Sequence, residues 1–138
     1  MTVRITGKQF DEITPEIQKA LDTALAGTLN LQQGALGKAN PKDTGRMSSS
    51  WFVGQNSPRR DTRPEDWAES GAERYEQEEY DQQIKFDGTW YISNNVPYAE
   101  YIAFKYQPAV AKAQKDWFTS IANQTGEVFN RQFNKVKP

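Results

Sequence analysis

Acidic side chains dominate one stretch of this sequence, and their type and number could support catalysis. Residues 57–83 contain nine Asp and Glu against four Lys and Arg, whereas residues 84–138 contain four against seven. Glu65 and Asp66 are neighbours within the acidic stretch. Acid–base catalysis needs two carboxyl groups that converge across a cleft, and adjacent residues of a helix do not face each other. We therefore predict that these carboxylates are mostly solvated, with a small carboxylate-based glycan hydrolase left open as an alternative.

The absence of two residue types removes most other chemistry. The 138 residues include no His and no Cys, so imidazole catalysis, thiol nucleophiles and zinc fingers are excluded. Ser48, Ser49 and Ser50 form a run, but no base is available to activate a hydroxyl. Gly34 and Gly37 lack the spacing of a phosphate-binding loop. We predict a protein that is not an enzyme and that has no catalytic residues, cofactor or metal.

Basic residues are too thinly spread to indicate a nucleic-acid-binding protein. Phosphate binding requires clustered Lys and Arg, and the only short cluster is PRRDTR at 58–63. A nucleic-acid-binding module stays a second alternative. The mean hydropathy is -0.87, and no apolar run approaches the roughly 20 residues that span a bilayer. We expect a protein of one domain, residues 1–138, that is made in the cytoplasm and has no membrane partner.

The first element that must position any site is a helix from about Thr14 to Leu31. Its apolar residues recur at spacings of three and four, and they are Ile17, Leu21, Ala24, Leu25 and Leu29. Thr14 is expected as the N-cap and Pro15 at the first helical position. Gly34 and Gly37 are expected to end the helix.

A strand is expected next, after a turn at Pro41, Asp43 and Gly45. Residues 47–53 then alternate with period two, so Met47, Ser49, Trp51 and Val53 would share one face, and Ser48, Ser50 and Phe52 the other. An aromatic residue on each face predicts that both faces are at least partly covered. The run of three serines predicts a half-exposed strand.

Residues 55–83 are interpreted as an acidic insertion, called the insert below. It opens with a polar loop and continues as a weak acidic helix anchored by Trp67, Tyr75 and Tyr80. A β-hairpin is predicted after it, with a loop at residues 86–88 in which Gly88 takes a positive φ. This loop sets Ile84 opposite Trp90, and a two-residue Asp-Gly turn is the alternative.

The C-terminal part is expected to be helical and rich in aromatic residues. Pro97 begins a short helix that ends near Gln107, before Pro108, and Tyr98, Tyr101 and Ile102 form one stripe on it. A long helix follows from about Pro108 to Phe133, with a break or kink at Gly126. It carries two apolar stripes, whose members are Val110, Ala113, Trp117 and Ile121, and Phe118, Ala122, Phe129 and Phe133.

Two apolar stripes on one helix predict two partners. One is the sheet of the same chain, and the other is the first helix or another subunit. Because aromatic residues are favoured at protein interfaces, we predict an interaction surface, with core packing as an equally good account of about half of the rings. The predicted interface residues are Tyr98, Tyr101, Ile102, Trp117, Phe118 and Phe129.

Two short motifs resemble those of a phage family. Asp43-Thr44-Gly45-Arg46 begins a strand and is followed by Ser49 or Ser50, and Asn95 then precedes Pro97-Tyr98-Ala99 and Tyr101. Their order and separation, between a first helix and a long last helix, are similar to the tail completion or tail-to-head joining proteins of long-tailed phages, including the lambda type. That family usually continues into an acidic residue, an aromatic residue and Gly, where this chain has Ala103, Phe104 and Lys105.

The resemblance implies a structural protein with an α+β fold, a small antiparallel sheet packed by an N-terminal helix and a long C-terminal helix. It implies a homo-oligomeric ring, six subunits being expected, at the head-proximal end of the tail in the virion. The implied partners are tail-terminator or tail-tube proteins and neck or connector proteins. DNA would pass through the lumen without sequence-specific binding. We expect the insert to face that lumen or a neighbouring ring, where its negative charge keeps DNA from adhering.

Overall fold

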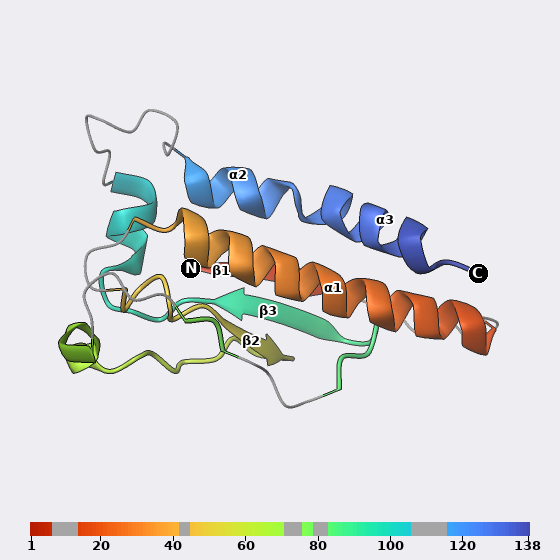
Figure 1. Cartoon of the computed structure of the whole chain (residues 1–138), viewed down its shortest axis with the longest axis horizontal. Helices are drawn as coiled ribbons and strands as arrows, with labels where there is room; N and C mark the ends of the chain where they lie inside the picture. Colours follow the sequence, from red (N-terminus) through yellow and green to blue (C-terminus); the bar gives the residue numbers. More distant parts are fainter. Residues whose placement is uncertain (7–13, 42–44, 71–75, 79–82, 106–115) are drawn as a thin grey trace.

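A three-stranded antiparallel sheet forms the base of the fold in the computed structural model (Figure 1). The structure describes residues 1–6, 14–41, 45–70, 76–78, 83–105 and 116–138. The strands are β1 (Thr2–Thr6), β2 (Phe52–Gln55) and β3 (Thr89–Ser93), in the order β1-β3-β2. Val3 and Val53 both pair with Ile92. Side chains alternate across a strand, so these three apolar residues share the face that lies in the core.

The predicted hairpin before β3 is wrong. Residues 83–88 form no strand, because both edges of β3 are taken by β1 and β2. Gly88 does have the predicted positive φ, of 67°. Ile84 and Trp90 are both buried, so the apolar pattern marked core positions correctly while the pairing was assigned to the wrong partner. The strand β1 was not predicted, although Val3 and Ile5 alternate with polar residues.

Helix α1 (Pro15–Ala39) covers one face of the sheet. Its predicted start is confirmed, because the Thr14 hydroxyl accepts a hydrogen bond from the Ile17 backbone N–H at 3.3 Å and Pro15 is the first residue. Its predicted end is wrong. The helix continues through Gly34 and Gly37, which are buried, and a Cβ at Gly34 would lie 3.1 Å from Gln77 Oε1. Close packing against the insert, rather than a helix end, accounts for Gly34.

The expected strand over residues 47–53 is correct only in its second half. Residues 46–49 form a turn, with the Ser49 N–H donating to the Gly45 carbonyl at 3.0 Å, and β2 begins at Phe52. Ser48, Ser49 and Ser50 are buried, so the expectation of a half-exposed strand is also wrong. The prediction of coverage on both faces is confirmed, since Phe52 is 3% exposed and Val53 1%.

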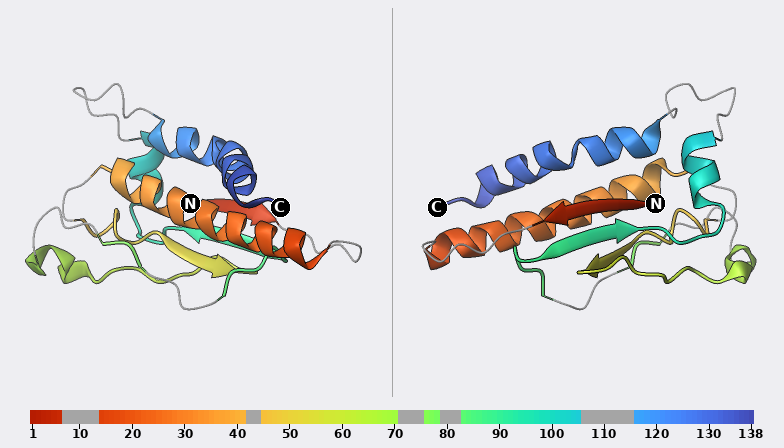
Figure 2. Two further views of the ribbon diagram at one scale, coloured as in Figure 1. Left: turned by 45° about the vertical axis from the view of Figure 1, so that its right-hand side comes forward. Right: turned by 180° about the vertical axis from the view of Figure 1, so that it is seen from behind.

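The C-terminal helix is interrupted. It is described as α2 (Trp117–Asn123) and α3 (Thr125–Val136), which meet at Gln124, two residues before the Gly126 at which a break was predicted. Both run alongside α1 in the opposite direction (Figure 2). The expected start of this helix, with Pro108, Val110 and Ala113, and the end of the preceding helix at Gln107 lie outside the described residues.

The predicted α+β fold is therefore confirmed, with the sheet, α1 and the C-terminal helices packed around one cluster of apolar residues. The most deeply buried side chains of that cluster are Leu25, Leu29, Leu36, Trp51, Val53, Trp90 and Ile92. Two short helical turns complete the described part, η1 (Glu65–Ser70) and η2 (Tyr101–Lys105). Among the helices described, none has the length and apolar character needed to cross a bilayer.

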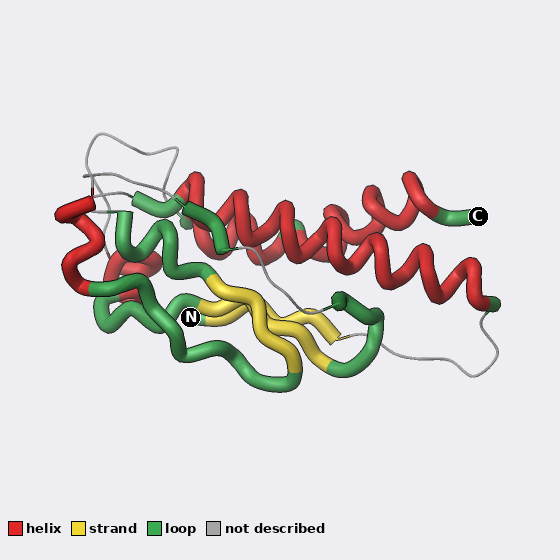
Figure 3. The backbone as a smooth tube through the Cα atoms, turned by 60° about the horizontal axis from the view of Figure 1, so that its bottom comes forward, coloured by secondary structure: helices red, strands yellow, loops and turns green. Residues whose placement is uncertain are grey.

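The first part of the insert, which carries Arg59 and Arg63, packs on the side of the sheet opposite α1 (Figure 3). In the chain the insert lies between β2 and β3 and includes η1. Where a weak acidic helix was expected, the described residues have the short helical turn η1 but no helix at 76–78, and the predicted anchor Trp67 is buried. The other two anchors, Tyr75 and Tyr80, lie outside the described residues.

Candidate functional site

The two motif segments, about 50 residues apart in the sequence, meet in the fold. Asn94, which is 4% exposed, donates from Nδ2 to the Met47 carbonyl at 2.8 Å and accepts from the Val96 N–H at 3.2 Å. The first bond holds the end of β3 against the turn after Gly45, and the second forms a local Asx turn. Asn94 thus fixes the position at which the chain enters Pro97-Tyr98-Ala99.

Both segments line one open pocket of about 430 Å³. Residues of the first motif turn form one wall, the start of η1 another, and the helical turn after the second motif the third. The lining residues are Pro41, Gly45, Arg46, Met47, Ser48, Glu65, Tyr98 and Ile102. Gly45 has a φ of 79°, a conformation that glycine adopts without strain. Arg46 donates from Nε to the Arg63 carbonyl at 2.9 Å, which ties the pocket to the insert.

The family-motif residues are placed as follows. Asp43 and Thr44 lie outside the described residues. Gly45 and Arg46 lie in the turn before β2 rather than at the start of a strand. Asn95 is exposed and donates from Nδ2 to the Arg60 carbonyl at 3.1 Å. Pro97 and Tyr98 are exposed and Ala99 is buried in the core, so the motif presents one side to solvent and packs with the other.

Three exposed aromatic residues follow one another closely in the chain, the first of them Tyr98 in the pocket wall, and we call them the aromatic patch. Tyr98 is 40% exposed, and Tyr101 and Phe104 are each 54% exposed. The Ile102 N–H donates to the Tyr98 carbonyl at 3.1 Å, which agrees with the predicted helical stripe. Ile102 itself is half-buried against the core. Phe104 is held from beneath by an edge-to-face contact with Phe118 at 5.8 Å.

The remaining predicted interface residues pack within the chain. Trp117 is 6% exposed and Phe118 8%, because both pack on Trp51, with ring centroids 6.1 and 5.8 Å away. Phe129 is half-buried and stacks on Phe86 at 5.4 Å. Trp117 and Phe118 were assigned to an interface because they belong to two different apolar stripes of one helix, and two stripes predicted two partners. In this fold they are core residues, and the aromatic patch is what remains exposed.

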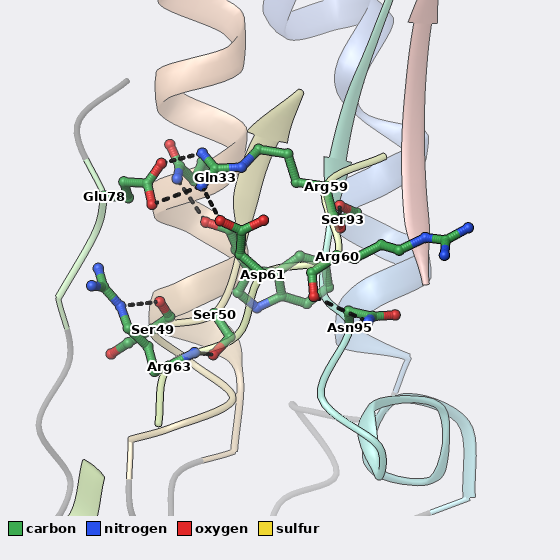
Figure 4. Close-up of polar contacts among 11 residues, drawn as sticks. Gln33, Ser49, Ser50, Arg59, Arg60, Asp61, Arg63, Glu78, Ser93 and Asn95 are labelled. Carbon is green, nitrogen blue, oxygen red and sulfur yellow. Dashed lines mark hydrogen bonds and ion pairs between the residues drawn. The ribbon is translucent and has the colours of Figure 1, made fainter. Parts of the chain in front are cut away.

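The serines next to the motif turn hold the insert in place, a role that the sequence did not suggest (Figure 4). The Ser50 hydroxyl accepts from the Arg63 N–H at 2.9 Å, and the Ser49 hydroxyl accepts from the Glu76 N–H at 2.9 Å. Arg63 also donates from Nε to the Ser49 carbonyl at 3.0 Å. A run of small hydroxyl side chains before an apolar strand was the available signal, because such side chains commonly satisfy backbone groups.

Two acidic residues of the insert form ion pairs, although its carboxylates were predicted to be mostly solvated, and Glu65 and Asp66 are exposed. Arg59 pairs with Glu78 and, at 2.6 Å, with Asp61. The hydrogen bond from Arg59 holds the pKa of Asp61 below its ordinary value, and the same bond raises the pKa of Arg59. The Arg59 and Arg63 guanidinium groups lie 4.9 and 5.5 Å from the centre of the Phe52 ring. These contacts cover Phe52 on the sheet face that α1 does not reach.

The insert also reaches α1. Gln77 donates from Nε2 to Asn30 Oδ1 at 2.9 Å and to Gln33 Oε1 at 3.2 Å. Gln33 in turn donates to the Trp51 carbonyl at 2.7 Å. A chain of hydrogen bonds therefore connects the insert to the residue before β2. Within the part of the chain that the structure describes, no three acidic side chains come together as a metal site.

Comparison of the chain with protein-family models, with curated proteins and with solved structures finds no match.

Proposed function

We propose that this chain is a structural protein of a phage neck or tail and not an enzyme. In this proposal it forms a ring, of six subunits, at the head-proximal end of the tail, and it joins the tail to the head connector. Its neighbours along the tail axis would be tail-terminator or tail-tube proteins on one side and neck or connector proteins on the other. The protein would reside in the virion after synthesis in the host cytoplasm.

One observation supports the proposal more than any other. The two motifs on which the phage resemblance depends lie far apart in the sequence, and the segments that carry them line the same pocket. Tyr98 of the aromatic patch lines that pocket, and large rings with a polar edge are favoured in interfaces. A joining protein needs such a surface, because it must hold neighbouring subunits without acting on them chemically.

The insert has a second role in this proposal. Its carboxylates would line the lumen or face a neighbouring ring and keep passing DNA from adhering. Three acidic residues of the insert serve to test this, and they are Glu76, which is exposed, Glu78, which is bound to Arg59, and Glu79, which lies outside the described residues. The triple variant Glu76→Gln, Glu78→Gln, Glu79→Gln removes three negative charges from the insert. Slower DNA ejection in that variant is the expected result, and unchanged ejection counts against the lumen position.

The joining role is tested by electron microscopy of lysates. A phage or prophage that carries the gene with an early stop codon should produce filled heads beside separate tails. A copy of the gene supplied in trans should restore joined particles, which excludes an effect on neighbouring genes. Intact and infectious virions from the stop-codon lysate would refute the proposed function.

A further inference from the structure

The sheet has two outer strands, β1 and β2, because its order is β1-β3-β2. In an antiparallel pair, every second residue directs its N–H and C=O at the neighbouring strand, and the residues between direct theirs away. The Asn94 N–H donates to the Met1 carbonyl at 3.1 Å, which fixes this alternation for β1. The residues of β1 whose backbone groups point away from β3 are Thr2, Arg4 and Thr6.

This outer edge of β1 is open among the described residues. Thr2, Arg4 and Thr6 are exposed, and their backbone groups form no hydrogen bond with a described residue. Figure 2 shows β1 at the outer side of the sheet. The edge of β2 differs, because Val53, whose backbone groups point away from β3, is 1% exposed. An open edge can accept a further strand through main-chain hydrogen bonds.

The two faces of β1 specify the side chains that an added strand would carry. On the face toward α1, Val3 is 6% exposed and Ile5 is half-buried against the apolar cluster. On the opposite face, Arg4 is exposed and has no ion pair with a described residue. Side chains of paired residues lie on the same face of a sheet. An apolar residue beside Ile5 would therefore complete its burial, and an acidic residue opposite Arg4 would form a cross-strand charge pair.

The charge beside the start of β1 is also positive. A pocket of about 440 Å³ is lined by Thr2, Arg59 and Arg60 together with residues that are all uncharged in their side chains. Arg59 is neutralised by its ion pairs within the insert. Arg60 has no ion pair with a described residue, and its side chain extends away from Asp61 (Figure 4). The exposed Asp87, two residues before β3, lies near the other end of β1.

A second copy of this chain fits the open edge poorly. If β1 paired with β1 of another copy in full antiparallel register, Thr2 would lie opposite Thr6, and Arg4 opposite Arg4. Like charges directly opposite each other destabilise a sheet, and a charged residue on an edge strand is one means by which proteins prevent identical edges from pairing. The charge therefore favours a different protein as the occupant.

We propose that β1 accepts an extended segment of a partner protein as a fourth, antiparallel strand. In that segment an acidic residue lies opposite Arg4, between two apolar residues that face the side of α1. Main-chain hydrogen bonds supply the affinity, and the alternating side chains supply the specificity. This inference goes beyond the proposed function and does not rest on it, so the result of the stop-codon experiment leaves it unaffected.

A synthetic peptide of the sequence Thr-Val-Glu-Ile-Thr with blocked ends is the probe, because it has the required alternation. Its binding is followed through the backbone amide signals of the full chain in NMR spectra. At saturating peptide, hydrogen exchange of the Arg4 and Thr6 amides should slow by about tenfold or more, since these N–H groups gain acceptors. The Val3 and Ile5 amides already face β3 and should change little.

Two matched peptides separate strand pairing from simple charge attraction. N-methylation of the Glu removes an N–H that would face β1, and it should abolish binding. N-methylation of the Val removes an N–H that would point away from β1, and it should preserve binding. Equal binding of the two methylated peptides overturns the proposal.

A charge reversal tests the chemistry of the partner. The peptide with Lys in place of Glu should bind at least about fivefold more weakly, and Arg4→Glu should reverse that preference. Slow exchange of the Arg4 and Thr6 amides without peptide, lost on dilution of the chain, would assign the edge to a second copy. Failure of every peptide to bind would leave Arg4 as a residue that only prevents pairing. Either result overturns the proposal.

Discussion

The insert is more closely packed against the rest of the chain, and the aromatic patch more exposed, than their compositions suggest. The insert is rich in charge, yet its described part is bound to the sheet and to α1 through Ser49, Ser50 and Gln77. The aromatic patch is rich in apolar surface, yet its rings are 40–54% exposed. Charged side chains are ordinarily the exposed ones and aromatic rings the buried ones. The comparison indicates that the insert contributes to folding, while the patch is available to a partner.

The largest loss of stability should come from truncating Phe52, the aromatic side chain on which the insert packs. Phe52→Ala deletes a side chain that is 3% exposed and sits beneath Arg59 and Arg63. We expect the free energy of unfolding to fall by about 3–5 kcal/mol, the usual cost of truncating a buried Phe. Urea denaturation measures the change. Phe104→Ala is the control in the exposed patch, and a comparable loss there would remove the contrast between the regions.

The next effect tests whether the serines hold the insert. Ser50→Ala leaves the Arg63 N–H without its acceptor, at a cost of about 1–3 kcal/mol for an unsatisfied buried group. Hydrogen exchange should also show faster exchange of that amide. Ser57→Ala is a matched control at an exposed position, and it should change the unfolding free energy by less than about 0.5 kcal/mol. Equal effects would mean that the insert is not held by these hydroxyls.

Local signals predicted parts of this fold, and long-range packing decided the rest. Thr14 and Pro15 act within one turn, so the start of α1 could be read from the sequence. Gly34 failed as a stop signal because its lack of a side chain accommodates Gln77, 43 positions further along the chain. The pairing of β3 with β1 joins residues such as Val3 and Ile92. No local pattern specifies a partner that distant, which is why the hairpin was assigned instead.

The same distinction applies to the candidate site. The helical stripe of Tyr98 and Tyr101 is a local property, and it was predicted. Which aromatic side chains are covered is a property of the whole fold. Trp117 and Phe118 therefore could not be separated from Tyr98 and Tyr101 until the position of Trp51 was known.

A smaller effect is expected for the ion pairs of the insert. The pKa of Asp61 is lower in the folded chain than its ordinary value of 3.8. The pair with Arg59 therefore stabilises the fold above that value, and the stabilisation is lost as the pH falls through the lower folded pKa. Because Asp61 is exposed, the contribution at pH 7 should be less than about 1 kcal/mol.

Arg59→Gln should thus lower the unfolding free energy at pH 7 and lower it less as the pH falls well below 3.8. High salt should also reduce the difference from the unchanged chain, since it screens exposed charges. Arg60→Gln, at the exposed neighbouring position, should show neither dependence. A pH-independent loss in Arg59→Gln would assign its effect to the contact with the Phe52 ring instead.

The smallest effect on folding is expected in the aromatic patch, where the effect on assembly should be largest. Tyr101 is 54% exposed, so Tyr101→Ala should change the unfolding free energy by less than about 0.5 kcal/mol, as is usual for exposed positions. The same change removes a large aromatic side chain from the proposed interaction surface, and truncating a Tyr that acts as a hot spot costs about 2 kcal/mol or more of binding. Urea denaturation and oligomer size, measured on one preparation, separate the two quantities. If the variant loses stability and still assembles, the Tyr101 side chain belongs to the core. That result would place the insert and the patch on the same side of the comparison, and the patch would no longer be the surface left for a partner.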